Sequence, residues 1–204
     1  MLVPAPHFAA FPLPAERPVV SDAGAIPVHH RTIALVGLMG VGKSTVGRRL
    51  ARRLDLPFAD GDVEIEAAAA MTVSDIFARL GESEFRAGEA RVMKRLLEGP
   101  RMVLATGGGA VLNPETRALL KTRAITVWMR ADLETVSQRV QRRDTRPLLR
   151  GRDPLEALRA MAEVRYPVYE TADLMVDVAT GAHAQAVEAI VSALEAHLAA
   201  EAKA

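Results

Sequence analysis

The feature that most constrains the fold is a glycine-rich segment that directly follows an apolar run. Residues 33–36 are apolar, and the sequence continues as Gly37-Leu-Met-Gly-Val-Gly-Lys43-Ser44. Glycines at 37, 40 and 42 permit turns and close approaches that a Cβ would block. The loop amides and the N-terminus of a following helix can then surround phosphate oxygens. Lys43 would reach the β- and γ-phosphates and the Ser44 hydroxyl would bind Mg²⁺, so the segment predicts a nucleoside triphosphate site rather than a plain glycine turn.

Bulk composition limits the possible classes of protein. The length of 204 residues suits one domain with a sizeable core. A net charge of +1 creates no general field toward nucleic acid or an anionic membrane. The absence of cysteine excludes disulfides and thiolate chemistry. No apolar run approaches the roughly 20 residues that span a bilayer.

The first thirty residues differ from the rest. They contain six of the twelve prolines and only three charged side chains. We expect residues 1–30 to be a disordered, Pro- and Ala-rich extension, followed by one domain at 31–204. No basic segment precedes an apolar run there, so a secretory signal is not expected and the protein should be cytoplasmic.

Apolar runs alternate with amphipathic segments along the remaining chain. We expect strands at 33–36, 57–59, 101–105, 124–129 and 174–178, and helices at 43–54, 63–70, 73–80, 82–97, 114–121, from 132, at 154–166 and over 187–198. Pro167 is expected to end the helix that starts at Pro154. Five strands that alternate with helices predict an α/β fold, a parallel sheet covered on both faces, with ligands at the carboxyl ends of the strands.

Polar groups follow three of these strand ends. Asp60 and Asp62 flank a glycine after the second strand, where one carboxylate can hold Mg²⁺ and the other can orient an attacking hydroxyl. Gly107-Gly108-Gly109 follows the third strand, where bare amides can donate to a ligand. Phosphate-loop enzymes usually end that strand with a metal-binding aspartate. Ala105-Thr106 stands there instead, so Asp60 should take more of that role.

Each of four arginines can be interpreted either as a ligand-binding residue or as a structural or solvated charge. Arg165 follows apolar residues on one helical face, so it should point inward and need an anion, either Glu89 or a ligand carboxylate. The ordinary interpretation of Arg86 is an exposed ion pair with Glu82 or Glu89. Arg139 and Arg146 flank or lie in a basic segment, 141–153, that can close over ATP as a lid or be a solvated loop.

Together these residues resemble the shikimate kinases over about 31–198. The resemblance rests on the loop 37–45, Asp60-Gly-Asp62 with Glu64-Ile-Glu66, Gly81-Glu82 with Glu84-Phe85-Arg86 and Glu89, Gly107-Gly-Gly-Ala110, Arg146-Pro-Leu-Leu149, and Arg165 before Pro167 and Tyr169. The first motif is common to many kinases, whereas the ordered set is highly specific. Gly61 departs from the small hydroxyl residue that many members have between the aspartates.

The resemblance implies a P-loop kinase fold with strand order 2-3-1-4-5, a lid at about 141–153, and transfer of the γ-phosphate of ATP to the 3-hydroxyl of shikimate, in aromatic amino-acid biosynthesis. It implies a monomer that uses ATP, shikimate and Mg²⁺, without nucleic acid or membrane. The implied catalytic residues are Lys43, Asp62 and Arg146; the ATP-binding residues Gly40, Val41, Gly42, Lys43, Ser44, Thr45, Arg139 and Arg146; the shikimate-binding residues Asp62, Arg86, Gly108, Gly109 and Arg165; and the metal-binding residues Ser44 and Asp60.

Two alternatives remain at this point. A gluconate kinase also has an Asp-Gly-Asp after its second strand, but that family continues with His-Pro, whereas Val63-Glu64 stands here. A non-catalytic nucleotide-binding regulator would be expected to lack Lys43, Asp62 or Arg146, and all three are present.

Overall fold

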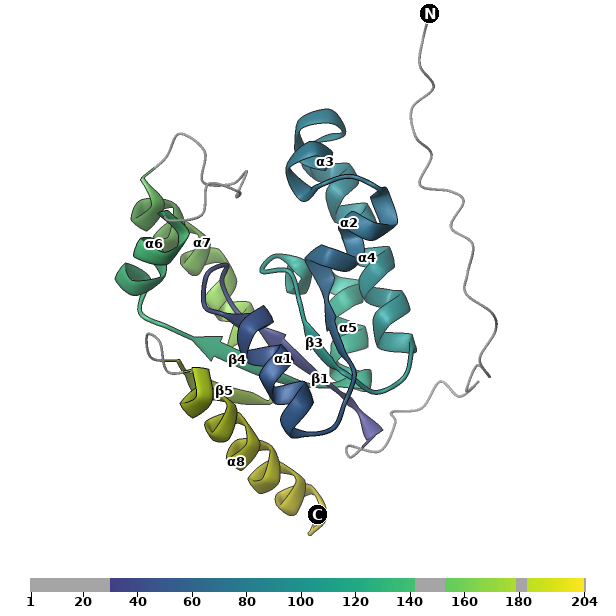
Figure 1. Cartoon of the computed structure of the whole chain (residues 1–204), viewed down its shortest axis with the longest axis vertical. Helices are drawn as coiled ribbons and strands as arrows, with labels where there is room; N and C mark the ends of the chain where they lie inside the picture. The colour runs from purple at the N-terminus through teal and green to yellow at the C-terminus, as the bar shows by residue number, and fades with distance from the viewer. Residues whose placement is uncertain (1–29, 142–152, 179–182, 204) are drawn as a thin grey trace, which may run out of the picture.

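Five parallel strands form one sheet at the centre of the molecule (Figure 1). The structure is a computed structural model that describes residues 30–141, 153–178 and 183–203. The strands are β1 (Thr32–Val36), β2 (Phe58–Asp60), β3 (Val103–Ala105), β4 (Ala124–Arg130) and β5 (Leu174–Asp177), in the order β2-β3-β1-β4-β5. This is the predicted order.

The central strand β1 is buried along its whole length. A continuous apolar run is what a strand covered on both faces requires. Ala105 at the end of β3 pairs with Leu35 of β1 on one side and with Asp60 of β2 on the other. Three strand ends are therefore aligned, and the loops that leave them start from one edge of the sheet.

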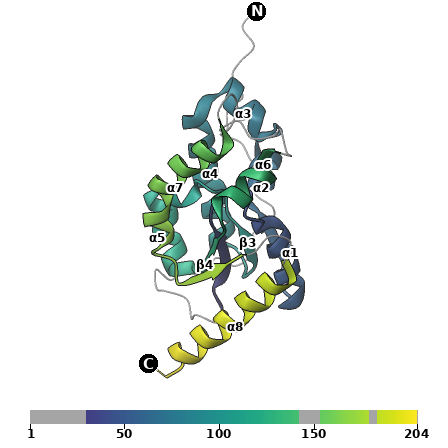
Figure 2. The same ribbon diagram turned by 90° about the vertical axis from the view of Figure 1, so that its left-hand side faces the viewer.

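Helices cover both faces, as predicted. They are α1 (Lys43–Arg53), α2 (Gly61–Ala69), α3 (Val73–Arg79), α4 (Gly81–Glu98), α5 (Pro114–Arg123), α6 (Leu133–Gln141), α7 (Pro154–Tyr169) and α8 (His183–Glu201), with a 3₁₀ turn, η2 (Ala110–Leu112). Helices α1 and α8 pack together on one face, and α5 packs with α4 and β4 on the other (Figure 2). None of the helices in the described ranges is long and apolar enough to span a membrane.

The segments beyond the carboxyl edge of the sheet form two walls. Figure 1 shows α3 and the start of α4 on one side of the loop after β1, and α6 on the other. Helix α6 packs on α7, and α3 packs on α4. The space between these walls lies directly above the aligned strand ends.

Several predicted helix boundaries differ from the structure, among them the end of α5 at Arg123 and both ends of α8, and two of the differences have a clear physical cause. Helix α7 continues through Pro167 to Tyr169 instead of ending at Tyr166. The missing N–H of Pro167 removes one helical hydrogen bond. Only two helical residues follow it, and the packing of Tyr169 in the core favours the continuation. Helix α2 begins at Gly61, two residues early, because the Asp60 side chain accepts a hydrogen bond from the Asp62 amide and caps the helix.

Candidate functional site

The loop between β1 and α1 has the backbone shape that its glycines predict. Gly37, Gly40 and Gly42 have φ angles of 140°, 81° and 100°, in the region that L-residues with a Cβ rarely adopt. A Cβ on Gly40 would lie 2.7 Å from the Val140 side chain, so α6 packs directly on this loop. The loop is therefore both turned and tightly held.

The side chain of Lys43 is held inside this loop. Its Nζ donates to the carbonyl oxygens of Gly37 at 2.8 Å and Leu38 at 2.9 Å. The ammonium group is thus held against the backbone of the loop, at the start of which Gly37 and Leu38 lie.

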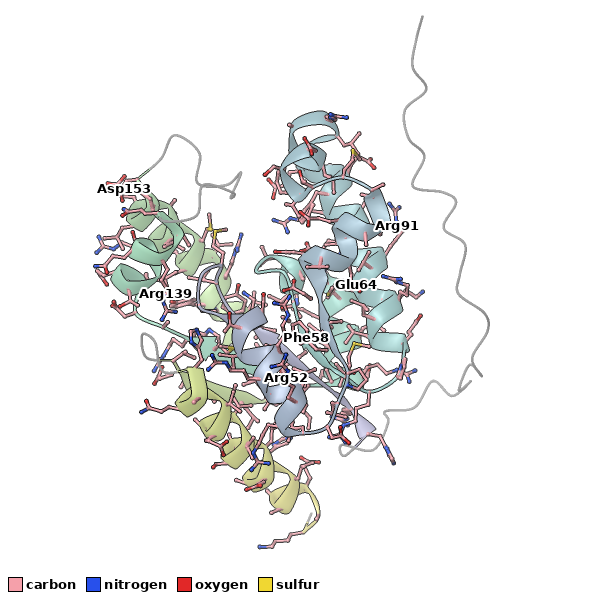
Figure 3. The ribbon with its side chains drawn as sticks, viewed as in Figure 1. Arg52, Phe58, Glu64, Arg91, Arg139 and Asp153 are labelled. Carbon is pink, nitrogen blue, oxygen red and sulfur yellow. The ribbon has the colours of Figure 1, made fainter. Side chains whose placement is uncertain are left out.

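A cavity of about 340 Å³ opens in front of the loop, and we call it the phosphate cavity. Its lining includes Gly40, Gly42, Lys43, Ser44, Thr45 and Arg139, six residues that were predicted for ATP. Arg139 comes from α6 (Figure 3), and its Nη1 is 3.5 Å from the Gly40 carbonyl. Val41 differs: its side chain is buried in the core, so only its backbone can face a ligand. Arg146 lies outside the described residues.

Oxygen groups suitable for a metal line the same cavity. Ser44 and Asp60 both line this cavity. Asp60 is at the end of β2, where it pairs with Ala105 at the end of β3. Within the described ranges there is no group of three or more His, Asp or Glu side chains that could enclose a metal. A pair of protein oxygens fits Mg²⁺, which keeps several waters and is completed by nucleotide phosphates.

A second, smaller pocket of about 60 Å³ adjoins this cavity, and we call it the arginine pocket. Its polar wall contains Asp62, Arg86, Glu89, Arg165 and the turn 107–109, and its apolar wall contains Met39, Val73, Phe77 and Phe85. Asp62 and Gly108 line both spaces. A group held in the arginine pocket would meet a group from the phosphate cavity at these two residues.

At each of the three consecutive glycines, 107 to 109, a Cβ would meet a different charged side chain. A Cβ on Gly107 would lie 2.5 Å from the Glu89 carboxylate, and one on Gly108 would lie 3.1 Å from Nη1 of Arg165. A Cβ on Gly109 would meet the Arg86 guanidinium, 2.8 Å from its Cζ. Each glycine therefore leaves space for a charged side chain of the arginine pocket.

Arg86 is held by two carboxylates of its own helix. Its Nη1 donates to Glu89 at 2.7 Å and its Nη2 donates to Glu82 at 3.0 Å, while the guanidinium lies 5.1 Å from the Phe85 ring centre. Glu89 is buried, and burial raises its pKa even though Arg86 acts in the opposite direction. Arg86 forms the expected ion pairs with both glutamates, but the pair with Glu89 is buried rather than exposed, and Arg86 and Glu89 both line the arginine pocket.

Arg165 is buried, as predicted, with 6% exposure. Its hydrogen-bonding partner is the Tyr169 hydroxyl, one turn further along α7. Arg165 acts on Glu89 only through space, by lowering the pKa of that carboxyl, since the near partner of Glu89 is Arg86. The sequence predicted either Glu89 or a ligand carboxylate as the partner of Arg165, and it did not predict Tyr169 as a partner.

The structure adds two polar side chains to the phosphate cavity that the sequence did not predict for the site. His183, the first residue of α8, lines the phosphate cavity and lies near Gly42. Burial, Arg49 and Arg139 all lower its pKa. Thr106 also lines the cavity and donates its hydroxyl to the Leu35 carbonyl at 3.0 Å. No local motif marks His183, because it reaches the loop only through the packing of α8 on α1.

The family model and the most similar relatives agree on one family. The family model described as shikimate kinase matches residues 39–195. A shikimate kinase from Caulobacter vibrioides is 56% identical over 88% of this chain and 90% of its own, and one from Bradyrhizobium diazoefficiens is 49% identical over 95% and 92%. The solved structure of a shikimate kinase from Acinetobacter baumannii in complex with shikimate is 38% identical, with a TM-score of 0.78 over 81% of this chain and 93% of that one.

Proposed function

The chain belongs to the shikimate kinase family, and from this premise we propose how its site transfers the γ-phosphoryl group of ATP to the 3-hydroxyl of shikimate. The observation that carries the assignment of roles is the junction of the phosphate cavity and the arginine pocket at Asp62 and Gly108. A donor in one space and an acceptor in the other would meet there, which is the geometry that phosphoryl transfer needs.

The arginine pocket suits a small hydroxylated carboxylate. Arg86 and Arg165 supply two guanidinium groups, and a planar guanidinium pairs well with a carboxylate. Phe77 and Phe85, whose ring centres are 4.6 Å apart, give the pocket an apolar wall for the carbon ring. Shikimate has both the carboxylate and the ring.

Asp62 would act on the hydroxyl that is phosphorylated. It lies on the boundary of the two spaces, where its carboxylate can accept the hydroxyl hydrogen bond and orient the oxygen toward the γ-phosphate. The Gly108 and Gly109 backbone would contact the acceptor on the other side.

The phosphate cavity would hold the nucleotide. Lys43 would exchange its two loop carbonyls for β- and γ-phosphate oxygens, and the amides of residues 40–45 would complete the cradle. Ser44 and Asp60 would hold Mg²⁺, which neutralises phosphate charge when bound. Arg139 would lie along the adenine, and Arg146 would reach the transferring group. His183, whose pKa is lowered by burial, Arg49 and Arg139, would lie near the phosphates.

A turnover assay tests this function directly. The purified protein is supplied with ATP and Mg²⁺ and with shikimate, gluconate or no acceptor, and ADP release is followed. We expect turnover with shikimate and none above background in the other two reactions. Turnover with gluconate would favour the alternative kinase, and nucleotide binding without turnover would favour the regulator. The monomeric state and the cytoplasmic location are further proposals, which sedimentation and cell fractionation would test.

A further inference from the structure

One buried hydroxyl connects two parts of the arginine pocket that come from distant segments of the chain. The hydroxyl of Tyr169 donates to the Gly108 carbonyl oxygen at 2.5 Å. The Tyr169 hydroxyl oxygen in turn accepts a hydrogen bond from the Arg165 guanidinium. A single atom therefore links the end of α7 to the glycine turn after β3, across 61 positions of sequence.

The surroundings of this tyrosine leave its ring little freedom. Tyr169 is 1% exposed, and its ring lies 6.0 Å from that of Trp128 and 6.3 Å from that of Tyr166, measured between ring centres. Burial raises its pKa to about 12. The hydroxyl is therefore protonated at every pH where the protein would work, and it can always donate to Gly108.

Both partners of the hydroxyl line the arginine pocket, whereas Tyr169 does not. Nη1 of Arg165 also lies next to Gly108, because a Cβ there would be only 3.1 Å from it. Without the hydroxyl, the buried guanidinium and the Gly108 carbonyl would each lose a partner. The turn 107–109 and the arginine would then be free to shift relative to each other.

We propose that Tyr169 is a positioning residue for acceptor recognition, which fixes the Arg165 guanidinium against the turn 107–109 through its hydroxyl. The inference rests on the proposed function, since it assigns shikimate to the arginine pocket. It goes further by naming a residue that acts on the acceptor without touching it. It also gives the last turn of α7, beyond Pro167, a reason to form.

The first test is Tyr169→Phe, which removes the hydroxyl and keeps the ring. We expect the KM for shikimate to rise roughly tenfold, as for the loss of a hydrogen bond to a charged group, while the KM for ATP stays within about twofold. The matched control is Tyr166→Phe, in the same aromatic cluster but outside the pocket, and both KM values should then stay at wild-type level. A loss of thermal stability in Tyr169→Phe with an unchanged shikimate KM would overturn the proposal.

A double-mutant cycle tests whether the hydroxyl acts through Arg165. In an Arg165→Lys background the planar fork that bonds to Tyr169 is absent. Adding Tyr169→Phe should then lower kcat/KM for shikimate by much less than the same change does in the wild type. Equal effects in both backgrounds would show that Tyr169 does not act through Arg165.

A third measurement needs neither turnover nor the Tyr169→Phe variant. The chain has only two tyrosines, 166 and 169, so Tyr166→Phe grown with 3-fluorotyrosine carries one fluorine reporter, at position 169. Shikimate alone should shift its ¹⁹F resonance, because the acceptor carboxylate changes the bonding of Arg165. A saturating shift without turnover would mean that the kinase function fails while the inference about Tyr169 holds. No shift in a protein that does phosphorylate shikimate would contradict the inference.

Discussion

Arg86 and Glu89 lie one turn apart on α4, and Nη1 of the arginine is 2.7 Å from Oε2 of the glutamate. The carboxylate is almost fully buried, whereas 27% of the arginine side chain is exposed, and Arg86 lines the arginine pocket. The buried glutamate thus fixes one nitrogen of the guanidinium by a hydrogen bond, while part of the arginine side chain stays accessible to a ligand. The nearby Gly107 and Gly109 have no Cβ to obstruct either group.

Burial of Glu89 should appear in the pH dependence of stability. Its pKa in the folded protein is raised above the ordinary value of 4.5, so the native state binds the proton more tightly than the unfolded chain. Its contribution to the free energy of unfolding is therefore full below 4.5 and is lost as pH rises through the raised pKa. In urea unfolding, the stability of the wild type relative to Glu89→Gln should be greater at about pH 4 than at about pH 7. Glu84→Gln, exposed on the same helix, should lack this trend. A relative stability that increases with pH would contradict the prediction.

Replacing Arg165 with alanine should affect acceptor use far more than nucleotide use. A charge-assisted hydrogen bond contributes roughly 1.5–3 kcal/mol, so kcat/KM for shikimate should fall at least tenfold while the KM for ATP changes little. Arg159→Ala is the control, because Arg159 is exposed on the same helix and pairs with Glu134. If Arg165→Ala lost stability but kept the shikimate KM, Arg165 would be a structural residue only.

Gly109→Ala should displace Arg86 without straining the backbone. The φ angle of Gly109 is −100°, which alanine adopts readily, yet the new Cβ would lie 2.8 Å from Cζ of Arg86. We expect kcat/KM for shikimate to fall about tenfold or more, as when a binding group is misplaced, with a melting temperature close to that of the wild type. Gly99→Ala, at the end of α4 and away from both pockets, serves as control. An unchanged kcat/KM would mean that Arg86 does not bind the acceptor.

Arg146 is the residue predicted to act on the transferring phosphoryl group. A guanidinium in that role contributes roughly 10³–10⁵ in rate in other phosphoryl-transfer enzymes, so Arg146→Ala should lower kcat by orders of magnitude while shikimate still binds. Arg146→Lys should restore only part of the rate, because a point charge lacks the planar fork. Arg52→Ala, exposed on α1 (Figure 3), is the control. A single-turnover rate for Arg146→Ala within about threefold of the wild type would refute this role.

The sequence by itself determined the parts of the site that depend on local chemistry. The glycines of the phosphate loop, Lys43 and Ser44 require one backbone shape, and the apolar runs around them require a buried parallel sheet. Since parallel strands end at one edge, the meeting of Asp60, Asp62 and the turn 107–109 with the loop was also predictable. The burial of Arg165 followed from helical spacing alone.

Tertiary structure decided which groups contact each other within that frame. Tyr169 reaches Gly108 only because α7 passes Pro167, against the local preference of the residue before a proline. Glu89 pairs with Arg86 rather than Arg165, and His183 reaches Gly42 through the packing of α8 on α1. Propensity and periodicity describe neighbours along the chain. The partner of a buried polar group is selected instead by the free energy of burying it unpaired, and that depends on which distant segments the fold brings near.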